Sequence, residues 1–397
     1  MEIKTLICIY NFLPYSDTEG NNTAKDIYNK KEKIDIIHNT LPSKKDEDYY
    51  KLIKKYINND ILIDAKTSWK WEDIKIFIKK AFKALDELST EGKYKRLYTV
   101  SMFPINHLFG FIYKIRNPDV EWIARFSDPS LISMKAYKKY IKIDKEDRDK
   151  INQILEKNNR KVYDSDNFYF YGEYLPLAFA DKIIFTNESQ KELMLNYLPI
   201  DEIKDEINNK SIIKKHDMPD KSLYAIKESK YNKIDKSKVN LAYFGVFYET
   251  RNIYNILSSL SVLDKELKDK VLIHLFIKNP NEFQKIINCM PIRKNIILNP
   301  YLPYLEFLNT LKKFDCLIVN DAKTKNVFRK NPYLPSKTSD YLGSGTDIWK
   351  ICEKNSPLSK IDTKYTSDLE NIFSVEKTLK KIIKDNTNLK FDLKQEI

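Results

Sequence analysis

The apolar positions of this chain follow two periods that alternate along the sequence. Short apolar runs, such as residues 97–102 and 315–320, indicate buried strands. Between such runs, apolar residues are spaced like one face of a helix, most clearly in residues 71–88. Strands that alternate with helices favour parallel sheets covered by helices.

The predicted elements form two series, separated by a polar stretch. The first series has strands at 5–10, 34–38, 97–102, 120–125, 182–186 and 212–214, and helices at 23–31, 71–88, 107–115, 173–180 and 188–197. Residues 11–22 are predicted to be a loop, and the highly charged residues 135–162 to be helical. The second series has strands at 239–245, 271–276, 295–298 and 315–320, and helices at 252–263, 280–289 and 303–313.

Two such series indicate an α/β protein of two Rossmann-like domains, whose parallel sheets face a central cleft. A chain of 397 residues is long enough for both. We predict domains at residues 1–210 and 238–370, with residues 211–237 as the connection between them. Residues 371–397 begin as an amphipathic helix, which we expect to cross back onto the first domain.

The segment after the strand at 315–320 carries the most specific pattern, Asn-Pro-Tyr-Leu-Pro-Ser-Lys-Thr-Ser-Asp-Tyr-Leu-Gly-Ser-Gly at residues 331–345. Ser336 is a good N-cap, and Gly343 suits the position just past a helix end. The pattern therefore predicts a short helix that begins at Lys337. Its N-terminus offers N–H groups to an anion. Asp340, one turn further, can accept hydrogen bonds from both ribose hydroxyls, so the pair suits a nucleoside diphosphate.

This segment resembles the P-S-K-x-x-[ED]-Y-L-x-x-G signature of family 4 glycosyltransferases, which have the GT-B fold. Three other segments are similar to the family: Phe-Ser-Asp-Pro at 126–129, residues 180–187 and residues 243–251. The resemblance covers roughly residues 3–365. It implies a metal-free and cofactor-free retaining transferase, which moves a sugar from a nucleotide diphosphate sugar to a hydroxyl of a lipid-linked cell-envelope glycan.

The resemblance also assigns roles to residues of the second domain. Asp340 stands at the position that holds the ribose, and Ser336 and Lys337 would meet the diphosphate. Gly245 and Arg251 lie in the turn after the first strand of the nucleotide-binding domain. A guanidinium there would offset charge that builds on the departing diphosphate.

Two features depart from the family pattern. Val246 occupies the place where the family usually has an arginine, so either Arg251 acts with Lys337 or activity is weakened. The first glutamate of the family's E-x7-E pattern is also absent, because Pro332 stands there with Asn331 beside it. The identity of the sugar therefore does not carry over.

In the first domain, the resemblance points to three places. The family often has a histidine near the transferred sugar, which matches His107, although a lone histidine is more often structural. Asp128 could accept the proton of the attacking hydroxyl, but Asp before Pro is also a common turn former. Arg125 is ambiguous in the same way. Gly20 and Asn21 lie in the first strand-to-helix loop, which in the GT-B fold reaches toward the donor phosphates.

Charge and residue composition limit the kinds of partner that the sequence predicts. The formal charge of +13 would suit an anionic partner, but a solvated lysine-rich surface explains it better. No arginine-rich tract or nucleic-acid signature is present, so we expect no nucleic-acid partner. The four histidines lack the spacing of metal ligands. The four cysteines form no C-x-x-C pair and are typical of buried thiols in a reducing compartment.

The expected location is cytoplasmic. No apolar run reaches the roughly 20 residues of a membrane span, and Met1 leads directly into a strand-like run. Helix 71–88 has lysines opposite its apolar stripe, which would allow peripheral association with the inner membrane face, although such a stripe is more often a core face. Three other functions remain open: a GT-B sugar-nucleotide epimerase, a non-catalytic sugar-nucleotide-binding homologue and, more distantly, a basic nucleic-acid-binding protein.

Overall fold

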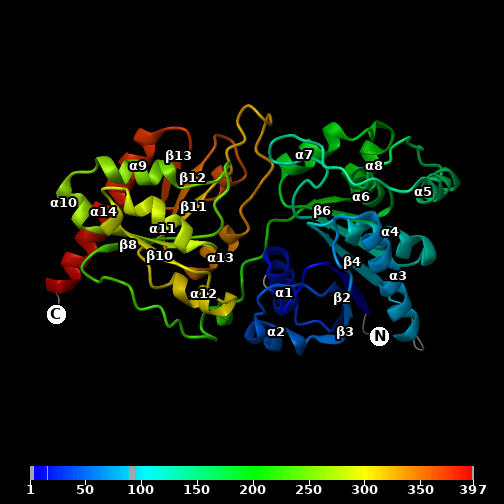
Figure 1. Cartoon of the computed structure of the whole chain (residues 1–397), viewed down its shortest axis with the longest axis horizontal. Helices are drawn as coiled ribbons and strands as arrows, with labels where there is room; N and C mark the ends of the chain where they lie inside the picture. The colour runs from blue at the N-terminus through cyan, green and yellow to red at the C-terminus, as the bar shows by residue number, and fades with distance from the viewer. Residues whose placement is uncertain (1–3, 16, 89–93, 396–397) are drawn as a thin grey trace. The chain divides into compact units, whose positions relative to one another are not determined.

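The computed structural model describes residues 4–15, 17–88 and 94–395, so the outermost positions of the predicted first and last domains lie outside the described residues. The chain divides into two compact units, Met1–His216 and Asp217–Ile397. Each is built on one parallel β-sheet, as the alternating pattern predicted (Figure 1).

The first unit has a seven-stranded sheet in the order β3-β2-β1-β4-β5-β6-β7. Its strands are β1 Thr5–Cys8, β2 Ile34–Asn39, β3 Ile57–Ile63, β4 Arg96–Ser101, β5 Glu121–Phe126, β6 Lys182–Phe185 and β7 Ser211–Ile213. Its helices are α1 Thr18–Lys30, α2 Glu47–Lys54, α3 Trp71–Leu88, α4 Ile105–Arg116, α5 Lys145–Lys157, α6 Phe168–Phe179, α7 Glu188–Tyr197 and α8 Lys204–Lys210.

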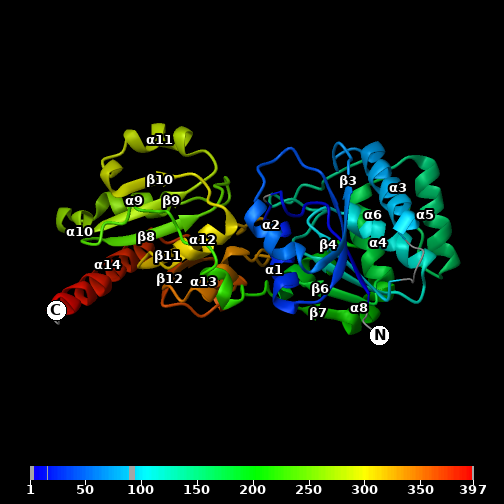
Figure 2. The ribbon, with the colours of Figure 1, turned by 90° about the horizontal axis from the view of Figure 1, so that it is seen from below.

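Side-chain alternation along β5 shows how helices cover both faces of this sheet. Trp122, Ala124 and Phe126 point to one face, where they join the core formed with α3, α4 and α6. Arg125 points to the opposite face, where its guanidinium pairs with Asp26 of α1. Figure 2 shows α1 and α2 on one side of the strands, with α3, α4 and α6 on the other.

The second unit has a six-stranded sheet in the order β10-β9-β8-β11-β12-β13. Its strands are β8 Val239–Phe244, β9 Val271–Phe276, β10 Ile296–Asn299, β11 Cys316–Asn320, β12 Ile348–Cys352 and β13 Tyr365–Asp368. Its helices are α9 Tyr254–Val262, α10 Lys265–Asp269, α11 Pro280–Asn288, α12 Tyr304–Leu311, α13 Lys337–Ser344 and α14 Ile372–Gln395, and the 3-10 turn η2 spans Lys221–Tyr224.

Each sheet has one point where the strand order reverses. In the first unit this switch point lies between β1 and β4, and in the second between β8 and β11. Ligands of doubly wound sheets bind at such points. The strand order therefore predicts one candidate ligand site in each unit, at its switch point.

Helix α1 begins earlier than the sequence pattern predicted. The prediction placed a loop at residues 11–22, but the helix starts at Thr18. Asp17 is its N-cap, and its Oδ1 accepts hydrogen bonds from the N–H groups of Glu19 (2.8 Å) and Gly20 (3.2 Å). Gly20 and Asn21 therefore lie in the first helical turn.

The C-terminal helix α14 packs onto the sheet of the second unit. Its apolar residues Val375, Leu379, Ile382 and Ile383 are fully buried in the core of the second unit. They pack there with residues of α9, β8 and β13. The apolar stripe that the sequence shows is therefore used within the second unit itself.

Candidate functional site

Buried polar atoms that lack a hydrogen-bond partner collect at the second unit's switch point. Within the described part of the chain they include Arg251 Nε after β8, Asn320 Oδ1 and Asp321 Oδ1 at the end of β11, and Thr338 Oγ1 in α13. Each such atom costs about 1–3 kcal/mol if nothing satisfies it. Their concentration at one place is typical of a ligand site.

Lys337 brings an ammonium group to this point. Its Nζ donates to the main-chain oxygen of Phe244 (2.6 Å) and lies 4.0 Å from the centre of the Tyr243 ring. Gly245 makes this approach possible, because a Cβ there would lie 2.7 Å from Nζ and its φ is +147°. Burial, and then the positive charge of Arg251, hold the pKa of Lys337 well below its usual range.

Arg251 supplies a second positive charge beside Lys337. Its main chain pairs with that of Tyr248 through two hydrogen bonds of 2.8 and 3.0 Å, which closes the turn after β8. Among the described residues, neither Arg251 nor Lys337 forms an ion pair with a carboxylate. Arg251 also lies near enough to the carboxyl group of Asp321 to lower its pKa against the effect of burial. An anion of at least two charges would relieve the mutual repulsion of Arg251 and Lys337.

Asp340 lies one turn beyond Lys337 and is 7% exposed. Its Oδ1 accepts a hydrogen bond from Tyr304 Oη (2.8 Å), at the start of α12. Its main-chain oxygen accepts one from Tyr224 Oη (2.6 Å) in η2. The carboxylate is therefore fixed in direction by a phenol from another helix, which sequence spacing does not reveal.

The ends of α13 differ in part from the prediction. Ser336 is the N-cap residue, but its side chain makes no capping hydrogen bond. The helix ends at Gly345 in the left-handed region (φ +75°), not at Gly343. Gly343 has a different purpose, because a Cβ there would lie 2.2 Å from Tyr224 Oη.

A glutamate from elsewhere in the chain holds the loop around Asn331, where the family 4 pattern has its first glutamate. Glu353, just after β12, accepts hydrogen bonds from Thr324 Oγ1 (2.7 Å) and from the Asn331 side chain (3.1 Å). The N–H of Glu353 in turn donates to Asp321 Oδ2 (3.0 Å). Burial raises the pKa of Asp321 to about 7. The side chain of Asn331 is therefore hydrogen-bonded within the protein. In the sequence, the only sign that Glu353 is buried is the apolar run that precedes it.

In the first unit, Gly20 and Asn21 stand beside the switch point but do not present free phosphate donors. The N–H of Gly20 already donates to Asp17. A Cβ at Gly20 would lie 3.1 Å from Asn11 O, so the glycine allows close packing of α1 on the loop after β1. Asn21 Oδ1 is buried and has no partner among the described residues.

The structure encloses His107 and exposes Asp128. His107 Nδ1 is hydrogen-bonded to Thr99 Oγ1 (2.8 Å), its ring packs on Phe126 at 4.7 Å, and it is 0% exposed. Burial lowers its pKa to about 3, so the ring is neutral. Its Nε2 is buried and has no hydrogen-bond partner among the described residues, so a place for His107 near the transferred sugar stays a prediction. Asp128 lies exposed in the turn after β5.

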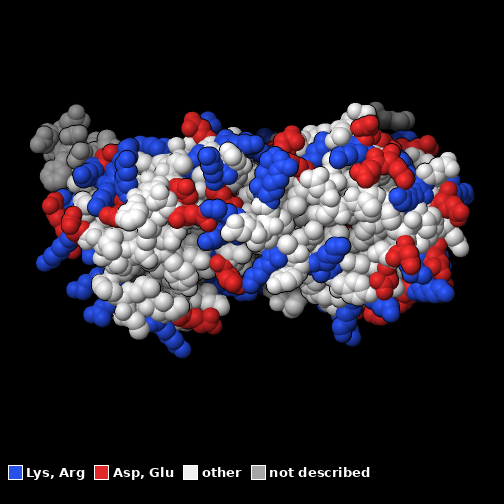
Figure 3. Space-filling model, turned by 90° about the horizontal axis from the view of Figure 1, so that it is seen from above, with Lys and Arg blue, Asp and Glu red and all other residues white. Residues whose placement is uncertain are grey.

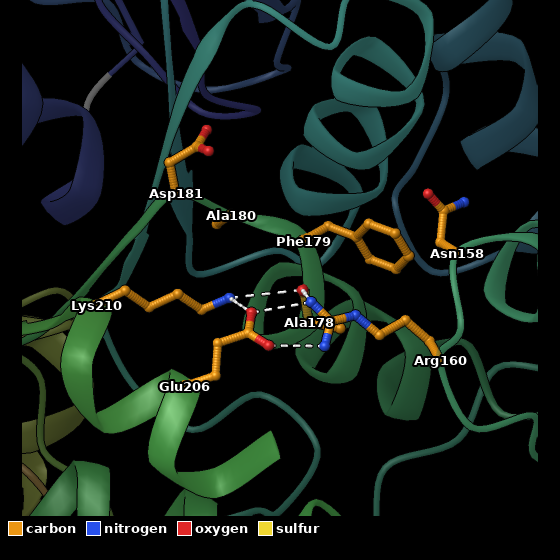
Figure 4. Close-up of a pocket in the computed structure, with 8 residues that line it drawn as sticks. All are labelled: Asn158, Arg160, Ala178, Phe179, Ala180, Asp181, Glu206 and Lys210. Atoms are coloured by element: carbon orange, nitrogen blue, oxygen red, sulfur yellow. Dashed lines mark hydrogen bonds and ion pairs between the residues drawn. The ribbon is translucent and has the colours of Figure 1, made fainter. Parts of the chain in front are cut away.

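A pocket of about 340 Å³ lies in the first unit at the amino end of β6, away from the carboxyl ends of the strands. Glu206 there bridges Arg160 (2.7 Å) and Lys210 (2.9 Å), so these charges satisfy one another (Figure 4). On the face drawn in Figure 3, basic side chains are interspersed with acidic ones. Among the described residues, no group of three or more His, Cys, Asp or Glu is placed to hold a metal, and no helix has the length and apolarity of a membrane span.

No protein-family model matches the sequence, and no curated protein matches it significantly. Its fold, however, is similar to several solved structures. WaaG, a glycosyltransferase involved in lipopolysaccharide biosynthesis, is 11% identical, with a TM-score of 0.54 over 96% of this chain and 90% of that chain.

A trehalose-6-phosphate protein from E. coli bound with UDP-2-fluoro glucose is 9% identical, with a TM-score of 0.54 over 98% of this chain and 95% of that chain. A putative UDP-N-acetylglucosamine 2-epimerase from Listeria monocytogenes is 9% identical, with a TM-score of 0.51 over 97% and 89%. These likenesses establish the fold, which is GT-B with two parallel α/β units.

Proposed function

We propose that this protein is a glycosyltransferase that takes a sugar from a nucleoside diphosphate donor and passes it to a hydroxyl of a cell-envelope glycan. One observation carries the proposal. Lys337, whose pKa burial lowers, lies beside the guanidinium of Arg251 at the switch point of the second unit and one helical turn from the buried carboxyl group of Asp340. That spacing suits a diphosphate joined to a ribose.

In this assignment the second unit holds the donor. The two cations and the N-terminus of α13 bind the diphosphate, and Asp340 accepts hydrogen bonds from the ribose. Tyr304 fixes the direction of the carboxylate through its hydrogen bond to Asp340 Oδ1. Lys337 reaches the space next to Gly245, so it supplies from α13 a cation that family 4 has directly after the glycine.

The same groups serve the chemistry. Negative charge builds on the diphosphate as its bond to the sugar breaks, and fixed cations stabilise that charge without a metal. We propose retention of configuration, with the hydroxyl attacking from the side on which the diphosphate departs, as in family 4. A lipid-linked acceptor would bring the protein to the inner membrane face, which cosedimentation with anionic vesicles tests.

Transfer is tested by incubating the protein with radiolabelled UDP-, GDP- and dTDP-sugars and a membrane extract as the acceptor source. The proposal expects label in the lipid extract from one donor. Lys337→Met is expected to abolish that label, while Lys285→Met, which changes an exposed lysine of α11, retains it. Label that never enters the extract, despite donor binding, would contradict transfer and leave epimerisation or the non-catalytic binding role.

Epimerisation is the second candidate, because one structural neighbour is a putative UDP-N-acetylglucosamine 2-epimerase. The same assay separates the two reactions. An epimerase changes the sugar of the nucleotide without any acceptor, and chromatography of the released sugar detects this. A transferase leaves the sugar unchanged and moves it only when an acceptor is present.

A further inference from the structure

Asp321 is a buried carboxyl group at the switch point of the second unit. It directly follows β11 and is 0% exposed. Its Oδ2 accepts a hydrogen bond from the N–H of Glu353 (3.0 Å), whereas its Oδ1 has no partner among the described residues. A buried carboxyl group with an unused oxygen is costly to keep charged. The geometry alone therefore favours a bound proton on Asp321.

The segment that carries Asp321 is fastened to the turn that carries Arg251. The N–H of Lys323 donates to the main-chain oxygen of Thr250 (2.6 Å), so the two segments are neighbours. Burial raises the pKa of Asp321 to about 7, and Arg251 opposes that rise. Burial, and then the same Arg251, lower the pKa of Lys337. Arg251 thus connects the carboxyl group electrostatically to the place proposed for the diphosphate.

The other groups that act on Asp321 come from the end of β12 and the residues after it. The hydroxyl of Ser356 and the N–H of Glu353 stabilise the carboxylate form and oppose the rise of its pKa, while the charge of Glu353 adds to the rise. The nearby thiol of Cys352 stays protonated, because burial and then Asp321 raise its pKa to about 11. Arg251 is therefore the cation that offsets the charge of Asp321.

Glu353, the neighbouring carboxyl group, is bonded differently. Its oxygens accept hydrogen bonds from the N–H of Thr324 (2.6 Å), the N–H of Lys325 (2.8 Å) and the side chain of Asn331 (3.1 Å). Both of its oxygens are thus engaged by protein donors. Of the two carboxyl groups, Asp321 is the one with an oxygen that no described residue satisfies.

An anion bound beside Arg251 would change the balance at Asp321. A diphosphate draws on the guanidinium that otherwise offsets the charge of the carboxylate. It also adds negative charge to the same site, and a like charge disfavours the ionised form of a carboxyl group. The bound anion therefore favours the protonated form of Asp321. By reciprocity, the proton favours the bound anion to the same extent.

We infer that Asp321 takes up a proton when the diphosphate binds, so that the second unit holds its nucleotide less tightly as the pH rises. This inference rests on the proposed donor site. Below a pH of about 7 the proton is already present, and the affinity has its full value. Above that pH the proton must be taken from solution, so each further pH unit weakens binding by up to about tenfold.

Calorimetry of UDP binding to the full-length protein measures the proton directly. Titrations at pH 8 in two buffers of different ionisation enthalpy give the number of protons taken up. The terminal phosphate of UDP titrates near a pH of about 6, so uptake at pH 8 belongs to the protein. We expect the wild type to take up more protons than Asp321→Asn, by up to one.

The affinities supply a second measure. Asparagine is neutral, like the protonated acid, so Asp321→Asn should bind UDP about tenfold more tightly than the wild type at pH 8 and equally at pH 6. Lys337 is present in both proteins, so its own titration cancels in this comparison. Asp362→Asn, which changes an exposed aspartate of the same unit, is the control and should match the wild type at both pH values.

Ser356→Ala tests the inference while it keeps Asp321 itself, which guards against a misfolded Asp321→Asn. The variant removes a hydroxyl that stabilises the carboxylate form. The pH at which UDP affinity begins to fall should therefore move upward, and UDP should bind more tightly than in the wild type at pH 8. A purely structural role for Asp321 predicts no such shift in the pH profile.

The outcomes distinguish this inference from the proposed function. UDP binding without proton uptake at pH 8, or uptake that persists in full in Asp321→Asn, would overturn the inference and leave the donor site standing. No UDP binding at any pH would overturn the donor site, and the inference with it. Uptake that depends on Asp321, without transfer of label to the lipid extract, would support the inference and contradict the transferase function.

Discussion

At the scale of single residues, burial favours the neutral form of one lysine and of one glutamate. Lys337 has its pKa held well below the usual range by burial and then by Arg251. Burial raises the pKa of Glu19 to about 7. Burial makes each group costly to charge, and a diphosphate bound beside Lys337 would offset that cost for the lysine.

Asp340→Asn tests ribose recognition apart from phosphate recognition. The amide still accepts the hydrogen bond from Tyr304 but loses the charge that strengthens bonds from ribose hydroxyls. We expect UDP affinity to fall about tenfold or more, which is roughly 1.5–3 kcal/mol for a hydrogen bond to a charged group. Affinity for inorganic pyrophosphate should stay the same. Calorimetry measures both, and an equal loss for both ligands would contradict ribose binding.

Glu19→Gln is expected to stabilise the protein at pH 8. The folded-state pKa, about 7, is above the ordinary value of 4.5, so the folded protein holds this proton more tightly than the unfolded chain. The free energy of unfolding therefore falls as pH rises from about 4.5 to 7, and the cost of Glu19 is complete above 7. The gain at pH 8 should be about 1–3 kcal/mol.

Urea unfolding at pH 8 and pH 4 measures that gain. Glutamine carries no charge at either pH, so the variant and the wild type should differ at pH 8 and agree at pH 4. Glu32→Gln is the matched control and should change neither value. A gain at both pH values would show that packing, and not ionisation, causes the effect.

At the scale of elements, α13 was predictable because its signals are local. Pro335 and Ser336 mark its beginning, and the prediction that it starts at Lys337 is confirmed. The edge strands β3 and β13 were missed because their sequences, Ile-Asn-Asn-Asp-Ile-Leu-Ile and Tyr-Thr-Ser-Asp, carry few apolar residues in a row. The start of α1 was missed because Asp17 acts as a cap before polar residues that show no helical apolar spacing.

Gly343→Ala tests how α13 is held in place. The new Cβ would lie 2.2 Å from Tyr224 Oη, so the helix or the tyrosine must move. We expect a loss of about 1–3 kcal/mol in the free energy of unfolding, together with weaker UDP binding, because Lys337 and Asp340 move with the helix.

Tyr224→Phe supplies the second arm of a double-mutant cycle. It removes the clashing oxygen, and by itself costs about 1 kcal/mol because Asp340 O loses a hydrogen bond. The double variant should therefore lose less stability than the two single losses added together. Strict additivity in urea unfolding would show that the clash is relieved elsewhere.

At the scale of the whole molecule, the pattern of alternating elements predicted two parallel α/β sheets, and the GT-B fold is confirmed. The residues that form hydrogen bonds to the site residues were not predictable, because only the tertiary fold brings them together. Tyr304 reaches Asp340 across 36 residues of sequence and Tyr224 across 116. Glu19 stood out only once its burial was known, because a glutamate in a polar segment normally faces solvent.

The division into two units predicts that UDP stabilises one of them selectively. Each unit has its own sheet and its own core, and the proposed donor groups Arg251, Lys337 and Asp340 all belong to Asp217–Ile397. A ligand that binds the native form at 100 times its Kd adds about 2.7 kcal/mol to the free energy of unfolding. Hydrogen exchange should therefore slow in β8, β11 and α13 by about a hundredfold.

Amides of β1, β4 and β5 in the first unit serve as the internal reference and should change by less than about threefold. In Lys337→Met, the same UDP concentration should slow neither group, because the ligand no longer saturates the site. Slower exchange confined to the strands of the first unit would place the nucleotide there. The cations of the second unit would then require a different anion.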